Sequence, residues 1–122
     1  MDKLEHIFAL QEQFNTELFS RRPEGNFTRE EWLQKLILAT NVELAELADE
    51  INYKWWKNAK SIDEDAVKEE LVDVLHFFVC MCLRMGMTAE ELHARYIGKN
   101  EENFNRQRGL SAKPGYAKEE NK

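Results

Sequence analysis

Hydrophobic residues recur along most of this chain at intervals of three and four positions, the spacing of amphipathic helices. The pattern breaks at residues 21–26, which contain a proline and a glycine, at residues 58–62, and at the glycine at position 86. It therefore predicts four helices, at about residues 2–19, 28–57, 63–85 and 88–107. A polar stretch without periodicity follows, so we expect one helical domain over residues 1–109 and a polar tail over residues 110–122.

Capping signals support these helix boundaries. Three capping boxes, in which a hydroxyl side chain precedes a glutamate by three positions, mark helix starts at Thr28-x-x-Glu31, Ser61-x-x-Glu64 and Thr88-x-x-Glu91. Gly86 is expected to end the third helix as its C′ residue. With only two prolines and five glycines, the chain is predicted to be all-α, a bundle of four helices.

Two acidic pairs interrupt the most hydrophobic segments: Glu43 with Glu46, and Glu70 with Asp73. A spacing of three residues places both carboxylates of a pair on one face of a helix. If the break at residues 58–62 folds the two helices back antiparallel, Glu46 and Asp73 lie at nearly equal distances from the turn. Four carboxylates would then converge, an arrangement suited to a hard divalent cation. Two solvated acidic stripes are the alternative, but such stripes rarely sit in segments this rich in hydrophobic residues.

Composition narrows the class of protein. A chain of 122 residues with 43% hydrophobic and 33% charged residues is typical of one globular domain. The net charge of −6 and the lack of a basic stripe argue against nucleic-acid binding. Charged residues at positions 2, 3 and 5 interrupt any signal peptide, and the longest hydrophobic run, residues 74–83, is too short to cross a bilayer. We therefore expect a cytoplasmic protein with no membrane partner, in which Cys80 and Cys82 are reduced core residues.

Three other groups of residues are candidates for ligand contacts. Gln11 and Asn15 form an i,i+4 pair of amides that could face a base edge, although solvent-facing amides are the default. The aromatic and basic segment 53–57 could close the bundle or line a phosphate pocket. The last helix carries a polar stripe that suits a polyphosphate or is ordinary solvated surface; its members are Tyr96, Lys99, Asn100, Asn103 and Arg106.

Taken together, these motifs resemble a known superfamily. Glu43-x-x-Glu46, followed after about two dozen residues by Glu70-x-x-Asp73, is similar to the signature of the all-α nucleoside triphosphate pyrophosphohydrolases, the MazG-like and dimeric dUTPase superfamily. The resemblance covers roughly residues 10 to 107 and is greatest to the dimeric dUTPase branch. The matching stretches are Leu10-Gln11 with Asn15, Glu43-Leu-Ala-Glu46-Leu, Tyr53-Lys-Trp-Trp-Lys57, Glu70-Leu-Val-Asp73-Val-Leu-His76-Phe and Tyr96-x-x-Lys99-Asn100-x-x-Asn103-x-x-Arg106-Gln107.

This resemblance implies a function and a set of site residues. It implies Mg²⁺, which Mn²⁺ could replace, held by Glu43, Glu46, Glu70 and Asp73. It implies attack by water on a nucleoside triphosphate, dUTP above all, to give the monophosphate and pyrophosphate, with Glu46 as the expected proton acceptor. Gln11 and Asn15 would contact the base, and the phosphate side would use Lys57, Lys99, Asn100, Asn103 and Arg106, with Tyr96 as a further substrate-binding residue. A homodimer or a dimer of dimers is the expected assembly.

Other functions stay open on sequence alone. The chain is shorter than many dimeric dUTPases, which leaves a broader-specificity MazG-like pyrophosphatase as an alternative. A di-iron or di-manganese bundle would need Glu-x-x-His motifs, approached only by Asp73-x-x-His76 and Glu90-x-x-His93. A non-catalytic helical interaction module would show no Mg²⁺ dependence of stability.

Overall fold

The computed structural model describes residues 1–23 and 27–119, and in them it contains four helices and no strand. The helices are α1 (Lys3–Arg21), α2 (Arg29–Glu50), α3 (Glu64–Arg84) and α4 (Ala89–Arg108). The prediction of an all-α fold with four helices is therefore confirmed. Two compact units, Met1–Thr88 and the chain from Ala89 onward, are described one at a time below. The single domain expected over residues 1–109 stays a prediction.

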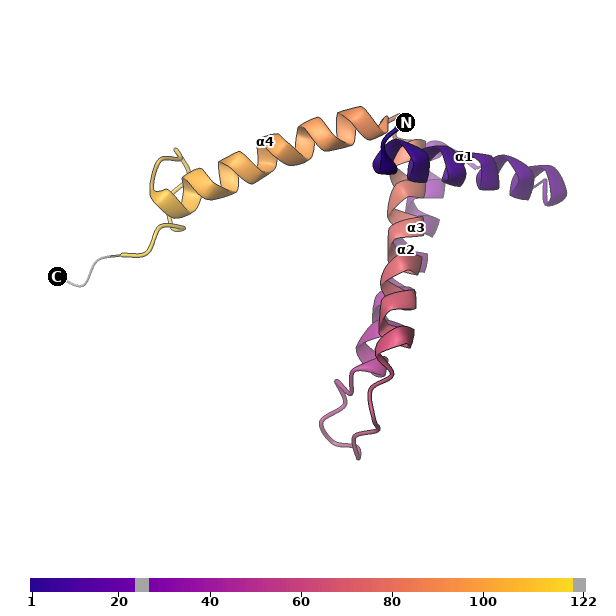
Figure 1. Ribbon diagram of the computed structural model, residues 1–122, viewed down its shortest axis with the longest axis horizontal. Coiled ribbons are helices and arrows are strands. Elements are labelled where there is room, and N and C mark those ends of the chain that lie inside the picture. The colour runs from indigo at the N-terminus through magenta and orange to yellow at the C-terminus, as the bar shows by residue number, and fades with distance from the viewer. Residues whose placement is uncertain (24–26, 120–122) are drawn as a thin grey trace. The chain divides into compact units, whose positions relative to one another are not determined.

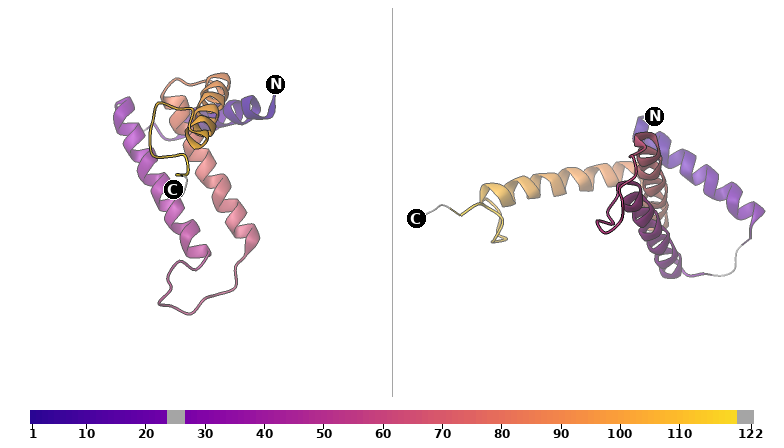
Figure 2. Two further views of the ribbon diagram at one scale, coloured as in Figure 1. Left: turned by 90° about the vertical axis from the view of Figure 1, so that its left-hand side faces the viewer. Right: turned by 90° about the horizontal axis from the view of Figure 1, so that it is seen from below.

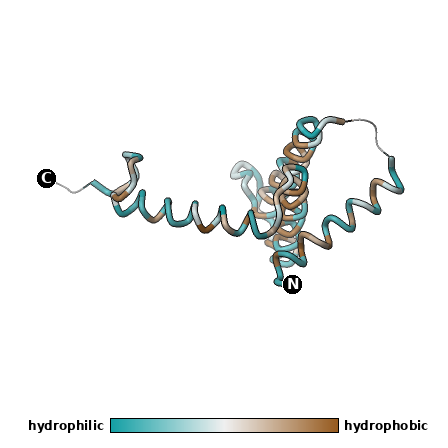
Figure 3. Tube along the Cα trace, turned by 90° about the horizontal axis from the view of Figure 1, so that it is seen from above, coloured by the Kyte–Doolittle hydropathy of each residue, from teal (hydrophilic) through white to brown (hydrophobic). Residues whose placement is uncertain are grey.

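In the first unit, α2 and α3 form an antiparallel hairpin, and α1 packs against α3 (Figures 1 and 2). Phe8 on α1, and Val79 and Cys82 on α3, are its buried hydrophobic residues. Hydrophobic residues are concentrated along α2 and α3 (Figure 3). Many of them are exposed in the isolated chain, including Leu38, Val42, Leu71, Val72 and Phe78. Only part of the hydrophobic surface of α2 and α3 is thus covered within one chain.

Side-chain caps fix the starts of these three helices. Asp2 accepts a hydrogen bond from the Glu5 amide, and Thr28 accepts one from the Glu31 amide at 3.1 Å, as the first capping box predicts. The box at Ser61 is wrong: Asp63 is the N-cap of α3 and accepts from the amides of Asp65 and Ala66. A carboxylate two positions later in the chain takes the place of the serine hydroxyl because aspartate is an equally good N-cap.

The end of α2 also differs from the prediction. We expected this helix to continue to about Lys57, but it ends at Glu50. Asn52 has a φ of 61°, in the left-handed region, and its side chain pairs with the backbone of Lys60 through two hydrogen bonds, of 2.8 and 3.0 Å. This pairing, which we call the Asn52–Lys60 clasp, closes the connection between α2 and α3. Tyr53, Trp55 and Trp56 therefore lie exposed on a loop rather than on a helix.

The second unit consists of α4 and the irregular segment that follows it. Gly109, with a φ of 76°, ends the helix, and the Leu110 amide donates to the Asn105 carbonyl. The segment folds back on the last turns of α4, where the Ser111 hydroxyl donates to Glu102 and Arg106 lies over the Tyr116 ring. The predicted tail is thus irregular in its described part, residues 110–119.

No single helix in the described ranges is long and hydrophobic enough to cross a membrane; by length and composition alone, only α3 and α4 taken together as a broken span pass the same test.

Candidate functional site

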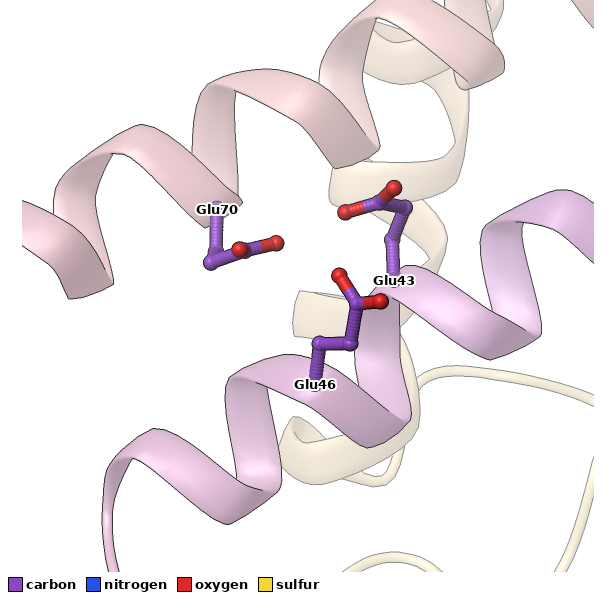
Figure 4. Close-up of side chains that lie close together, drawn as sticks. All are labelled: Glu43, Glu46 and Glu70. Carbon is purple, nitrogen blue, oxygen red and sulfur yellow. The ribbon is translucent and has the colours of Figure 1, made fainter.

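Three carboxylates from two helices meet in the first unit. Glu43 and Glu46 extend from α2 and Glu70 extends from α3, and the three point toward one another (Figure 4). One oxygen of each lies within 4.8 Å of the others. The hairpin brings this about, because the three-residue spacing of Glu43 and Glu46 turns both toward the facing helix. We call these three residues the carboxylate cluster.

Asp73, the fourth predicted ligand, is one turn further along α3 and is not among those three. Its negative charge nevertheless contributes to the raised pKa of Glu43, so it lies near the cluster. Asp73 and Glu43 also line one cavity. Its place as a metal ligand stays a prediction.

The metal-free cluster is electrostatically unfavourable. The pKa of Glu43 is raised from 4.5 to about 7, first by a hydrogen bond shared with Glu70, then by desolvation and by the neighbouring negative charges. When both are ionised that hydrogen bond is lost, because neither carboxylate can donate. Glu43 Oε2 and Glu70 Oε2 are then buried with no hydrogen-bond partner. A divalent cation would satisfy both oxygens and cancel the repulsion, so the residues present fit a bound metal ion.

The donor set indicates which kind of metal would bind. Among the described residues, the group of potential ligands contains only carboxylates and no histidine. Oxygen donors suit Mg²⁺, Ca²⁺ or Mn²⁺. A di-iron site would need a histidine ligand, and this group of residues contains none.

The raised pKa of Glu43 predicts the pH dependence of the metal-free protein. Glu43 keeps its proton up to about pH 7 when folded but loses it near pH 4.5 when unfolded. The folded state therefore binds more protons in this window, and the free energy of unfolding should fall as pH rises from about 4.5 to 7. Urea unfolding in EDTA at pH 5, 6, 7 and 8 measures this trend. In Glu43→Gln, which stays neutral, the trend should flatten; identical profiles for both proteins would contradict the assignment.

A cavity of about 770 Å³ lies beside the carboxylate cluster, within the size range of small-molecule sites. Glu43 and Asp73 contribute carboxylates to its wall, and Gln11, Asn15 and His76 contribute neutral polar groups. The rest of the wall is mainly aromatic and aliphatic, with three cationic side chains; it includes Phe14, Phe19, Phe27, Trp32, Phe77, Arg22, Lys35 and Arg84. The wall of this cavity thus combines carboxylates with a largely hydrophobic surface that also carries the two amides.

The two amides predicted to face a ligand are held in a network. Gln11 Nε2 donates to Asn15 Oδ1 at 3.0 Å, and Gln11 Oε1 accepts from His76 Nδ1. The Cys80 thiol donates to the same Asn15 oxygen at 3.6 Å. Cys80 is therefore part of the cavity wall and not only a core residue, whereas Cys82 is buried as predicted.

Cations and aromatic rings alternate in another part of the cavity wall. The Arg84 guanidinium lies 4.6 Å from the Trp32 ring centre and 5.1 Å from that of Phe19. Lys35 Nζ lies 4.3 Å from the Phe27 ring centre. Such stacking holds planar rings and cationic groups together at low cost, because the ring faces are electron-rich.

The other predicted substrate residues are not among the side chains that line this cavity. Lys57 is exposed on the loop between α2 and α3. The remaining ones are on α4, in the second unit, where Tyr96, Lys99, Asn100 and Asn103 are exposed. Arg106 is half-buried and donates to Glu102 at 3.2 Å, while the Ser111 hydroxyl and then Arg106 lower the pKa of the Glu102 carboxyl. Their roles at the phosphates stay predictions.

Sequence reasoning missed two members of the network. The sequence patterns place His76 in a family motif and in a near match to an iron-ligand motif, and Cys80 in the core, but link neither residue to the amides. Each is 65 residues from its amide partner in the sequence, so no local pattern links them. The available signal was a polar residue within the hydrophobic run 74–83, since a polar group there needs a partner.

Comparison with known proteins identifies the family. The profile of the dUTPase family matches residues 3–88. The dCTP pyrophosphatase of Enterobacteria phage T4 is 47% identical over 45 residues, which are 37% of this chain and 26% of the phage protein. Uncharacterized protein YpjD of Bacillus subtilis (strain 168) is 37% identical over 59 residues, 47% of this chain and 53% of that protein. The histidine biosynthesis trifunctional protein of Komagataella pastoris is 29% identical over 103 residues, 84% of this chain and 11% of that protein.

The chain thus covers less than two thirds of each of these relatives. No solved structure shows a significant match. The family profile, in contrast, spans most of the chain, including both acidic pairs and both amides. This chain belongs to the dUTPase family, in the all-α MazG-like superfamily.

Proposed function

We propose that this protein is a Mg²⁺-dependent nucleoside triphosphate pyrophosphohydrolase that converts dUTP and water to dUMP and pyrophosphate. The observation that carries the proposal is the carboxylate cluster, whose member Glu43 also lines a nucleotide-sized cavity. An acidic region for metal and phosphates next to an apolar region with amides matches the two ends of a nucleoside triphosphate. Membership of the dUTPase family supports the same reaction.

The residues divide the chemistry among them. Glu43, Glu46, Glu70 and Asp73 would hold the metal ion, and Mg²⁺ suits an all-oxygen donor set. The chemistry supplied by Mg²⁺ when bound is neutralisation of phosphate charge and a lower pKa for the attacking water. Glu46, the most exposed member of the cluster, is proposed to accept the proton of that water. Lys57 and the α4 residues Lys99 and Arg106 are proposed to stabilise charge on the pyrophosphate leaving group.

A panel of nucleoside triphosphates tests this function. Purified protein with Mg²⁺ should release pyrophosphate from dUTP and leave dUMP, with phosphate release requiring an added pyrophosphatase. Chromatography of the products separates this reaction from stepwise loss of phosphate. Release of single phosphates, or no hydrolysis of any nucleotide in the panel, would rule the proposal out.

A broader-specificity pyrophosphatase is the second candidate. The relatives named dCTP pyrophosphatase, 47% identical over 45 residues, favour activity beyond dUTP. The same panel decides between the two, because a broad enzyme would hydrolyse dCTP and purine nucleotides with similar kcat/KM.

We propose that the active form is a homodimer or a dimer of dimers. Leu38 and Val42 on α2, and Leu71, Val72 and Phe78 on α3, are hydrophobic and exposed in the isolated chain. Many large hydrophobic side chains exposed on one helix pair are typical of an interface rather than of free surface. Light scattering coupled to size-exclusion chromatography should give twice or four times the 14.4 kDa chain mass; a monomer at micromolar concentration would contradict this expectation.

A further inference from the structure

In each hydrogen bond of the amide network in the cavity, the chemistry of the atoms decides which partner donates. Gln11 Oε1 has no hydrogen, so the contact of 2.7 Å with His76 requires that Nδ1 carries the ring proton. Gln11 is only 7% exposed, so its amide is held by these partners rather than by water. With its oxygen turned to His76, Gln11 must turn its nitrogen to Asn15.

The orientation of Asn15 follows from that of Gln11. Asn15 Oδ1 accepts from Gln11 Nε2 at 3.0 Å and from the Cys80 thiol at 3.6 Å. Burial raises the pKa of the Cys80 thiol, which keeps the sulfur protonated and able to donate. Two donors occupy the two lone pairs of the Asn15 oxygen. The Asn15 amide nitrogen, with two hydrogens, is left for a ligand in the cavity that Asn15 lines.

We propose that His76 and Cys80 orient the Gln11–Asn15 pair so that Asn15 presents its amide nitrogen, a hydrogen-bond donor, to a base in the cavity, which favours uracil over cytosine. The inference rests on the proposed function and names the feature that would determine its base specificity. Uracil carries a carbonyl oxygen at position 4, which accepts from the Asn15 nitrogen. Cytosine carries an amino group there, so two donors would face each other and remain unpaired.

The opposite orientation would select the opposite base. If the atom at position 76 could only accept, Gln11 would turn its nitrogen to that position and its oxygen to Asn15. Asn15 would then donate to Gln11 and turn its oxygen into the cavity, where a 4-amino group could donate to it. His76 is therefore a specificity-determining residue that acts through Gln11, and Cys80 supports the orientation that His76 sets.

The role of His76 in base specificity is tested by the ratio of kcat/KM for dUTP to kcat/KM for dCTP. Wild-type protein should prefer dUTP, and His76→Asp, in which the new carboxylate can only accept, should shift the ratio toward dCTP by about 10-fold or more, the effect of one unpaired buried donor. A ratio is the right measure because the added negative charge weakens binding of both triphosphates alike. His76→Asn, whose amide can donate or accept, should give an intermediate ratio, and Cys80→Ser should keep the wild-type ratio.

His6→Asp is the matched control, since it makes the same charge change on the exposed face of α1, outside the cavity wall. A readout independent of activity comes from ¹⁵N NMR of the neutral His76 ring in the metal-free protein. The Nδ1-protonated form is expected, and the Nε2-protonated form would overturn the inference. An unchanged dUTP to dCTP ratio in His76→Asp would overturn it as well. Absence of all hydrolysis by wild-type protein would instead contradict the proposed function, and the ring tautomer would still decide the orientation of the amides.

Discussion

Glu46→Gln is expected to lower kcat for dUTP hydrolysis by about 10²–10⁴-fold, the usual contribution of a general base. Glutamine keeps the size of the side chain but cannot accept the proton of the attacking water, and it is a weaker ligand for a cation. The fold should persist, because Glu46 is exposed and the change removes one of several like charges that face each other across the hairpin. Circular dichroism should therefore show the same helix content, and the melting temperature without metal should stay the same or rise.

Glu69→Gln is the control for this experiment. It makes the same chemical change on the exposed surface of α3, next to Glu70 but outside the carboxylate cluster, and should keep wild-type kcat. If Glu46→Gln protein turned over dUTP at the wild-type rate, Glu46 would have no part in the proton transfer. If both variants lost activity equally, the loss would reflect surface charge rather than the cluster.

Mg²⁺ is expected to stabilise the folded protein strongly, and EDTA is expected to abolish hydrolysis. A cation that binds only the folded state at 100 times its Kd adds about 2.7 kcal/mol to the free energy of unfolding. For a domain of this size, that corresponds to a rise in melting temperature of roughly 10 °C. The structural reason is that a cation would provide a partner for the buried oxygens of Glu43 and Glu70. Thermal unfolding with increasing MgCl₂ at constant ionic strength measures the effect.

Loss of both buried carboxylates is the decisive comparison. Glu43→Gln combined with Glu70→Gln should melt at nearly the same temperature with and without Mg²⁺. A chain of net charge −6 also attracts cations to its surface, so a rise that persisted in this double variant would show binding outside the cluster. A non-catalytic helical module predicts no rise in either protein.

The helices and their chemistry could be predicted from sequence because both depend on local spacing. Hydrophobic periodicity located all four helices to within a few residues at most ends. The three-residue spacing of Glu43 and Glu46 also predicted that they share a face, and a hairpin then brings Glu70 opposite them. The same spacing predicted Asp73 as a fourth member, which the group of three carboxylates does not include.

What sequence could not supply depends on contacts between distant residues. Asn52 ends α2 early because its side chain finds the Lys60 backbone, and no glycine or proline announces that turn. The link from His76 to Gln11 likewise joins two helices that pack against each other, and helical periodicity says nothing about which polar side chains meet there. The proposed base specificity thus depends on contacts between distant residues, which the sequence pattern does not reveal.

The Asn52–Lys60 clasp has a consequence for how this family could diversify. Because two hydrogen bonds join the chain at both ends of residues 53–59, the alignment of α2 with α3 is insulated from whatever those seven positions display. Aromatic and basic side chains there can be exchanged, or the segment lengthened, while the facing acids keep their register. Residues 53–59 could thus acquire contacts with new substrates or binding partners without changing the arrangement of the carboxylate cluster.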